Sequence, residues 1–214
     1  MKSINEKIEN GRTYRDMEVR ALTDNDGYIV EGYASTFNDP YLLYKEEGYE
    51  VYEQVDKDAF KNTDMSDVIM QYDHEGRVFA RMSNNTLVVS PDEVGLHIRA
   101  DLGGTEIGRQ LYEEIKGGYT NKMSFGFTVK TDTRYTEEDK ESGITKVLRT
   151  ITDISKLYDV SAVSLPANPA TSISSRADGE GVIAEAKEEI LKAEEERKAK
   201  ERQRQKIRIL LEVK

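Results

Sequence analysis

A strand-like segment at residues 121–129 constrains this chain more than any other part of the sequence. Residues at every second position are apolar, so a strand here places one set on a core face: Met123, Phe125, Phe127 and Val129. Ser124 then stands on the opposite face, where its neighbours are Gly126 and Thr128. A hydroxyl held on a rigid strand between small residues is suitably mounted to act as a nucleophile.

A short helix is predicted directly before this strand. Thr105 can cap its first turn, and Gly117 with Gly118 can end it. Between them an apolar stripe recurs at intervals of four residues: Ile107, Leu111 and Ile115. The serine strand is therefore expected to follow a helix.

A serine hydroxyl becomes a good nucleophile only when a base takes its proton, and the chain has two histidines. His97 alternates with apolar residues beside Arg99, which predicts a solvated strand face without a chemical role. His74 follows the apolar run 68–72 and lies between Asp73 and Glu75, whose charges favour an imidazolium. His74 is therefore the predicted general base.

A third group must orient the imidazole, and a carboxylate is the usual choice. Asp159 is the first candidate, because a charged side chain within the β-rich segment 157–163 is costly to bury unless it has a partner or a function. Asp153, six residues earlier, competes with it on sequence alone. Ser161 and Ser164 lie in the same region and can be mistaken for the nucleophile.

Several motifs, in their order and spacing, resemble one known family between about residue 15 and residue 175. They are Glu31-Gly32-Tyr33-Ala34, Asp58-Ala59-Phe60, Tyr72-Asp73-His74-Glu75, Gly95-Leu96, Ser124-Phe125-Gly126-Phe127, Asp159-Val160-Ser161 and Pro166-Ala167-Asn168-Pro169. The chain thus resembles the prohead, or procapsid, maturation proteases of tailed bacteriophages. These serine peptidases are similar in fold and catalytic arrangement to the herpesvirus assembly proteases.

The resemblance implies that Ser124 is the nucleophile and His74 the general base. It implies a carboxylate before the Val-Ser of the late strand, commonly Glu in the family and Asp159 here. The implied substrates and partners are the phage scaffold protein and major capsid protein, with self-cleavage also expected. The implied location is the cytoplasm of the infected bacterial host, inside the immature capsid. A homo-oligomer is an open expectation, because the herpesvirus relatives work as dimers.

The composition of the chain excludes several kinds of chemistry and of location. The chain has 214 residues and no cysteine, so disulfides, thiolate nucleophiles and thiolate zinc sites are excluded. Two separated histidines make a zinc enzyme unexpected, and we expect neither a metal nor a cofactor. No apolar run approaches the ~20 residues of a membrane span, and residues 1–11 have no apolar core typical of a signal peptide. We expect no membrane association.

Alternating segments from Arg15 to Pro166 predict a mainly β fold with some helices, of the α+β class. Turn signals at 24–27 and 137–143 favour hairpins. With the resemblance, the expected architecture is an antiparallel β-barrel of the herpesvirus-protease type surrounded by a few α-helices. The expected divisions are an N-terminal extension at 1–14, a protease domain at 15–178 and a charged helical C-terminal tail at 179–214.

The tail differs in charge from the rest of the chain. Residues 180–214 hold 9 acidic and 10 basic side chains, whereas the remainder has 32 acidic against 21 basic. Such an acidic body gives no footprint for nucleic acid. Opposite charges four residues apart, as in Glu188 with Lys192 and Glu196 with Lys200, favour a tail helix. Its apolar stripe near Ile183 to Ala193, or residues 207–213, suggests a tether to helical scaffold chains.

Three classes of function remain open from the sequence. The first is a serine endopeptidase of prohead maturation. The second is a catalytically inactive capsid-assembly factor on the same fold, and the third is a β-rich capsid or tail protein without a site. A hydroxyl and an imidazole brought together by folding distinguish the first from the third.

Overall fold

The computed structural model of the protein describes residues 19–22, 27–164, 182–192, 195–196, 198–200 and 202–203. Strands dominate these ranges, as the sequence predicts. In chain order the elements are β1 (Val19–Ala21), β2 (Ile29–Thr36), β3 (Tyr41–Glu46), β4 (Tyr49–Val55), β5 (Ile69–Tyr72), β6 (Glu75–Arg81), η1 (Met82–Asn84), β7 (Leu87–Pro91), β8 (Gly95–Asp101), α2 (Glu106–Lys116), β9 (Lys122–Asp139) and β10 (Ile144–Val163). Residues 182–192 form a further helix.

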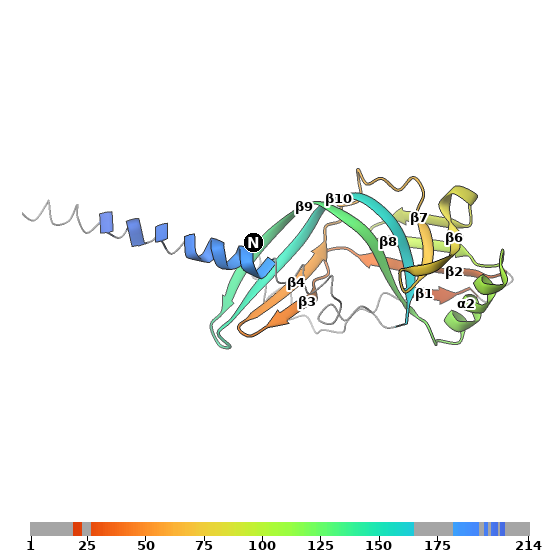
Figure 1. Cartoon of the computed structure of the whole chain (residues 1–214), viewed down its shortest axis with the longest axis horizontal. Coiled ribbons are helices and arrows are strands. Elements are labelled where there is room, and N and C mark those ends of the chain that lie inside the picture. Colours follow the sequence, from red (N-terminus) through yellow and green to blue (C-terminus); the bar gives the residue numbers. More distant parts are fainter. Residues whose placement is uncertain are drawn as a thin grey trace, which may run out of the picture.

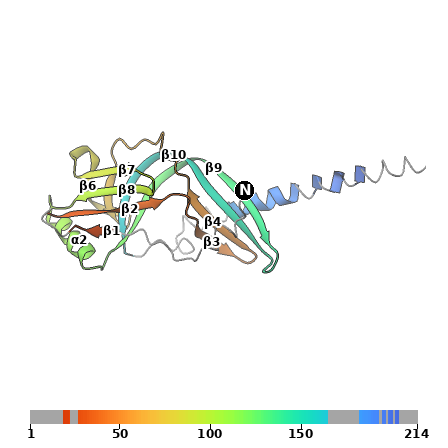
Figure 2. The same ribbon diagram turned by 180° about the vertical axis from the view of Figure 1, so that it is seen from behind.

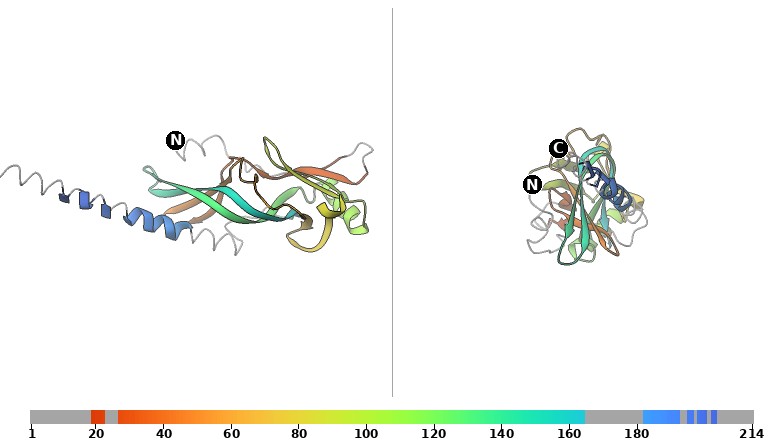
Figure 3. Two further views of the ribbon diagram at one scale, coloured as in Figure 1. Left: turned by 90° about the horizontal axis from the view of Figure 1, so that it is seen from above. Right: turned by 90° about the vertical axis from the view of Figure 1, so that its left-hand side faces the viewer.

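The long hairpin of β9 and β10 is the central element of the molecule. Its strands are 18 and 20 residues long and pair antiparallel along their length. One end lies beside β3, β4 and the helix of residues 182–192, and the other reaches the region of α2 and the β1–β2–β8–β7 sheet (Figures 1 and 2). The hairpin twists strongly between its two ends (Figure 3).

Both strands that pair with the other edge of β10 run parallel to it. β4 pairs with residues 145–151 and β5 with residues 159–162, so one long strand connects two otherwise separate hairpins, β3–β4 and β5–β6. The second sheet is antiparallel, in the order β1-β2-β8-β7. The main core includes apolar residues of both sheets, such as Val30, Ile98, Val160 and Ile154.

The predicted closed antiparallel barrel is wrong. The strands of the described residues form two open sheets, and the larger one mixes parallel with antiparallel pairing. Alternation in the sequence indicates which side chains face a core, but it does not indicate which strands pair. It therefore cannot distinguish a closed barrel from two packed sheets. The mainly β, α+β class is confirmed.

The predicted helix before the serine strand is confirmed. Thr105 accepts a hydrogen bond from the Gly108 amide at 3.0 Å and so caps α2. Leu111 and Ile115 lie in the main core, and the helix ends at Gly117. β9 begins at Lys122, five residues later. The turn predicted at 24–27 lies largely outside the described residues, but β1 and β2 pair as the hairpin it implies.

The helix of residues 182–192 packs on the end of the β3–β4–β10 sheet. Val182, Ile183 and Ala186 join a separate apolar cluster with sheet residues Leu43, Tyr44, Val51 and Val147. This part of the predicted scaffold-binding stripe is therefore covered by the chain itself. Residues 207–213, the other predicted tether, lie outside the described residues, as does the predicted domain boundary at 178/179.

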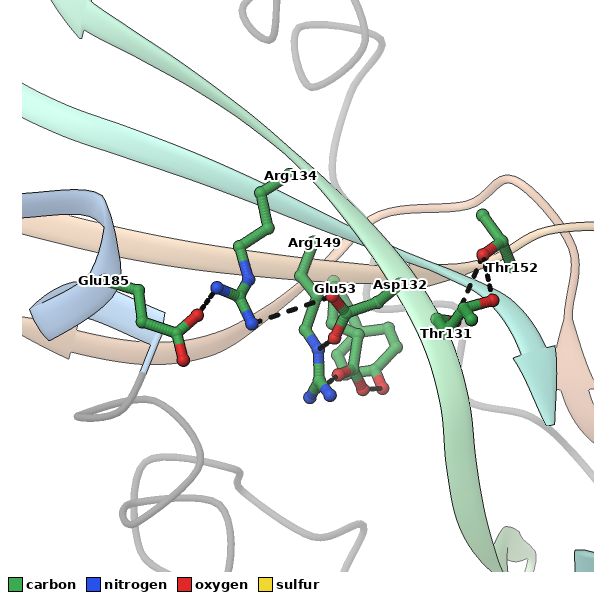
Figure 4. A network of polar contacts seen from close by, with 8 residues as sticks. Glu53, Thr131, Asp132, Arg134, Arg149, Thr152 and Glu185 are labelled. Atoms are coloured by element: carbon green, nitrogen blue, oxygen red, sulfur yellow. Dashed lines mark hydrogen bonds and ion pairs between the residues drawn. The ribbon is translucent and has the colours of Figure 1, made fainter. Parts of the chain in front are cut away.

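Ion pairs connect this helix to the sheet (Figure 4). Glu185 pairs with Arg134 of β9, and Arg134 lies 3.6 Å from Asp132. Arg149 of β10 donates to Asp132 at 2.6 Å and to Glu53 of β4 at 3.0 Å. The Tyr41 hydroxyl donates a hydrogen bond to the Glu53 carboxylate, and desolvation of that hydroxyl together with the negative charge of Glu53 raises the pKa of Tyr41 well above its usual value. The predicted pairs within the tail, Glu188 with Lys192 and Glu196 with Lys200, are also present.

Candidate functional site

The β9–β10 pairing sets the position of Ser124. Ser124 lies opposite Ser161, and Gly126 lies opposite Asp159. Directly opposed residues in an antiparallel pair project to the same face, and every second residue along a strand shares that face. Ser124, Gly126, Asp159 and Ser161 therefore share one face of the sheet.

The other face of β9 is apolar, as the alternation predicts. Met123 is buried, and Phe125, Phe127 and Val129 pack against the main core. The Phe125 and Phe127 rings stack with centroids 4.4 Å apart. This packing fixes the strand and so fixes the face on which Ser124 stands.

His74 lies in the tight turn between β5 and β6. Asp73 and His74 form a two-residue loop, and both have positive φ angles, 50° and 59°. Positive φ at both central residues is what a type I′ hairpin turn requires, although Asn and Gly are commoner there. The loop is held by Asp73, whose amide donates to the Ala162 carbonyl at 2.9 Å and whose carboxylate accepts from the Ser164 amide at 2.9 Å. The end of β10 thus anchors the turn that carries His74.

His74 and Asp159 are in direct contact. The Nδ1 atom of His74 lies 2.7 Å from Oδ1 of Asp159. An ionised carboxylate can only accept, so the ring donates from Nδ1 and, when neutral, keeps Nε2 free as an acceptor. The Asp159 side chain is buried, whereas that of His74 is 36% exposed. The ring therefore lies between a buried carboxylate and solvent.

Two further residues complete the surroundings of the carboxylate. The Ser161 hydroxyl donates to the same Oδ1 atom of Asp159 at 2.7 Å, and Ser161 is 0% exposed. At Gly126, an added Cβ would lie 2.1 Å from Oδ2 of Asp159. The carboxylate therefore rests in the space that the missing side chain of Gly126 leaves open.

The other residues that the sequence offered as members of the triad lie away from His74 and Asp159 or have other partners. Asp153 forms an ion pair with Lys130 at 2.8 Å. His97 is on β8 in the other sheet, with its ring against that of Tyr33 at 5.3 Å between centroids. The Ser164 hydroxyl contacts the Asp73 carboxylate. Of the residues weighed as members of the triad, the structure joins His74 with Asp159.

The structure does not join Ser124 to His74 by a hydrogen bond, although both residues lie in its described part. Hydrogen bonds of this kind are often long before substrate binds. Ser124 is partly exposed, so its hydroxyl is not sealed inside the core.

Within the described residues no group of three or more acidic, histidine or cysteine side chains could hold a metal ion.

The sequence analysis assigned no catalytic role to Ser161 or Gly126. The alternation along their strands nevertheless predicts that both lie on the same face as the predicted site residues. Ser161 is two residues after Asp159 and Gly126 is two residues after Ser124, so each shares a face with its partner. The assignment of Asp73 as a neighbour that favours the imidazolium missed its contact with Ser164, which depends on the distant end of β10.

A histidine held by a carboxylate, on the face of a sheet that carries a serine, is an arrangement that serine hydrolases use. The comparison with protein families agrees with this class. The model of the family described as caudovirus prohead serine protease matches residues 15–189 of the 214. The chain therefore belongs to the caudovirus prohead serine protease family.

At the level of this family, the chain is a serine peptidase of the phage procapsid. Neither the curated proteins nor the solved structures contain a significant match to it. In the described part of the chain, no helix combines the length and apolar character that crossing a membrane requires.

Proposed function

We propose that this protein is a serine endopeptidase that cleaves the scaffold protein, or the scaffolding segment of the major capsid protein, during prohead maturation. Ser124 is the nucleophile, His74 is the general base and acid, and Asp159 orients the imidazole. Family membership supports the class of enzyme. The observation that carries the site is the 2.7 Å hydrogen bond between His74 and Asp159 on the face that holds Ser124.

The chemistry follows from these positions. Asp159 keeps the ring proton on Nδ1, so Nε2 can take the proton of the Ser124 hydroxyl. The Ser124 Oγ then attacks the peptide carbonyl, and His74 returns the proton to the leaving amine as the C–N bond breaks. Water, deprotonated in turn by His74, releases the acyl group and restores the serine. Positioned proton transfer of this kind contributes about 10² to 10⁴ in rate.

Coexpression with the scaffold and major capsid proteins tests the proposal. Intact-mass analysis of the particles should show shortened scaffold or capsid chains with the wild type and full-length chains with Ser124→Ala. Ser90→Ala is a matched control, because Ser90 is an exposed strand serine on β7 in the other sheet. Unprocessed chains with the wild type, in particles that assemble normally, would favour the inactive assembly factor instead.

Self-cleavage is tested with the isolated protein. Incubation of the wild type should produce fragments that are absent from Ser124→Ala under the same conditions. Fragments that appear equally in both proteins would come from a contaminating protease and would argue against self-cleavage.

A further inference from the structure

The buried hydroxyl of Ser161 takes no part in the proposed reaction. It lies on β10 directly opposite Ser124, and it is fully buried. Its hydrogen bond goes to Oδ1 of Asp159, the oxygen that also accepts from His74. A buried hydroxyl usually has a partner because leaving it unpaired is costly. Here the partner is Oδ1 of Asp159, the same atom that forms the hydrogen bond with the His74 imidazole.

The two donors constrain the carboxylate from two directions. His74 approaches Oδ1 from the β5–β6 turn, and Ser161 approaches it from two residues further along β10. With one donor alone, Asp159 can rotate about its side-chain bonds while keeping that contact. With two donors on one oxygen, rotation breaks at least one hydrogen bond to a charged acceptor, and such bonds are stronger than neutral ones.

Gly126 constrains the other oxygen. Oδ2 of Asp159 lies where a Cβ at position 126 would stand, 2.1 Å from it. The backbone of Gly126 is not in the left-handed region that only glycine enters freely, because its φ lies outside the positive range. A side chain at 126 therefore conflicts with the present position of the carboxylate and not with the backbone conformation.

We propose that Ser161 and Gly126 are positioning residues that fix the Asp159 carboxylate, and through it the tautomer and orientation of His74. Ser161 does so by a hydrogen bond to Oδ1, and Gly126 by leaving space for Oδ2. This inference rests on the proposed function for its importance to catalysis. It also predicts a property of the resting protein that can be measured without any substrate.

The direct readout is the position of the ring proton on His74. The chain has two histidines, so the ¹⁵N resonances of a histidine-labelled protein can be assigned with His97→Gln. At a pH where the ring is neutral, the wild-type His74 should be mainly the Nδ1–H tautomer. Ser161→Ala removes one of the two donors, so the carboxylate moves and the Nε2–H tautomer appears in the spectrum.

The matched control is Ser35→Ala. Ser35 is the other buried serine in the described part of the chain, and its hydroxyl contacts the Thr36 carbonyl on β2. Its replacement should leave the His74 tautomer unchanged. A folded Ser161→Ala protein with the wild-type tautomer would overturn the proposed role of Ser161.

A second variant covers the case in which Ser161→Ala does not fold. Gly126→Ala should displace the carboxylate and give the same mixed tautomer as Ser161→Ala. It should also lower the unfolding midpoint in urea when Asp159 is present, and lower it less in an Asp159→Ala background, where the conflicting oxygen is gone. An equal effect in both backgrounds would show that the carboxylate does not occupy the space at Gly126.

The rate of reaction with diisopropyl fluorophosphate connects this geometry to reactivity. Displacement of about 1 Å at a reacting group can cost about 10²-fold in rate, so Ser161→Ala should slow the diisopropylphosphorylation of Ser124 by up to that factor. If the tautomer changes but no capsid chain is processed even by the wild type, the positioning role stands and the proposed function fails. If Ser124-dependent processing occurs while the tautomer is insensitive to both variants, the positioning role alone fails.

Discussion

At the scale of single residues, the site is built in layers. A buried hydroxyl, Ser161, contacts a buried carboxylate, Asp159, which contacts a partly exposed imidazole, His74. Each group forms a hydrogen bond with the next one outward. An order of this kind keeps a charge in the interior acceptable, because each polar group has a partner.

The two histidines give a matched pair of variants at this scale. His74→Gln should reduce the rate at which diisopropyl fluorophosphate phosphorylates Ser124 by at least about 10²-fold, because the base that takes the hydroxyl proton is lost. His97→Gln should leave the rate unchanged, because His97 lies in the other sheet against Tyr33. The measurement is the pseudo-first-order rate of adduct formation by mass spectrometry. Similar rates for the two variants would contradict the assignment of His74.

Local patterns predicted part of the arrangement around Ser124. Alternation gave the face of Ser124, and the contrast between a charged strand and the end of an apolar run selected His74 over His97. Local pattern did not indicate whether Asp159 or Asp153 lies beside His74, because that contact depends on the register of β10 against β9 and β5. Register is a nonlocal property that alternation does not determine.

At the scale of elements, the β5–β6 hairpin carries His74 at its tip and an ion pair at its base. Arg81, the last residue of β6, donates from Nε and Nη2 to the carboxylate of Asp67, two residues before β5. The Arg81 guanidinium, together with hydrogen bonds from Ser83, lowers the pKa of Asp67 from 3.8 to about 2. The pair thus closes the hairpin at the end opposite to the turn.

This pair predicts a pH dependence of stability. A carboxyl with a lowered pKa in the folded protein stabilises it above the unfolded value of 3.8, and this contribution is lost as the pH falls towards about 2. The difference in Tm between the wild type and Asp67→Asn should therefore be constant at neutral pH, decrease as the pH falls below 3.8 and vanish once the pH is below about 2. Circular dichroism melting curves across this range measure it. Arg81→Gln, which removes the same pair, should behave alike, and a difference that grows in acid would refute the interpretation.

The helix of residues 182–192 is also an element with a measurable contribution. Ile183 is 2% exposed in its contact with the sheet, whereas Leu191 is 61% exposed. Ile183→Ala should lower the free energy of unfolding by about 2–5 kcal/mol. Leu191→Ala, a similar loss of side chain on the same helix, should change it by less than about 0.5 kcal/mol. Urea unfolding curves measure both, and equal effects would mean that the helix does not pack on the sheet.

The elements themselves were predictable to different degrees. α2 has a cap, an apolar stripe and a glycine end within fifteen residues, so its sequence is sufficient to predict it. The 20-residue length of β10 and its parallel pairing with β4 and β5 were not predictable in this way. The paired residues are 96 positions apart for β4 and 90 positions apart for β5, and the pairing depends on how the whole chain folds.

At the scale of the whole molecule, one long hairpin joins a half that carries the site to a half that carries the C-terminal helix. β5, the end of β10 and the start of β9 build the first half, while β3, β4 and the other ends of β9 and β10 build the second. The sequence predicted a mainly β protein and the prohead protease family, and both are confirmed. It also predicted a closed barrel, which the structure replaces with two open sheets.

The central claim is that His74, held by Asp159, activates Ser124. The most direct test is to treat the full-length protein with diisopropyl fluorophosphate and map the adduct by peptide mass spectrometry. In the expected reaction the Ser124 Oγ bonds to phosphorus, fluoride leaves, and the hydroxyl proton passes to His74. We predict one adduct per chain, on Ser124, formed rapidly in the wild type and at least about 10²-fold more slowly in His74→Gln. An adduct on another serine, or equal rates in the two proteins, would contradict the claim.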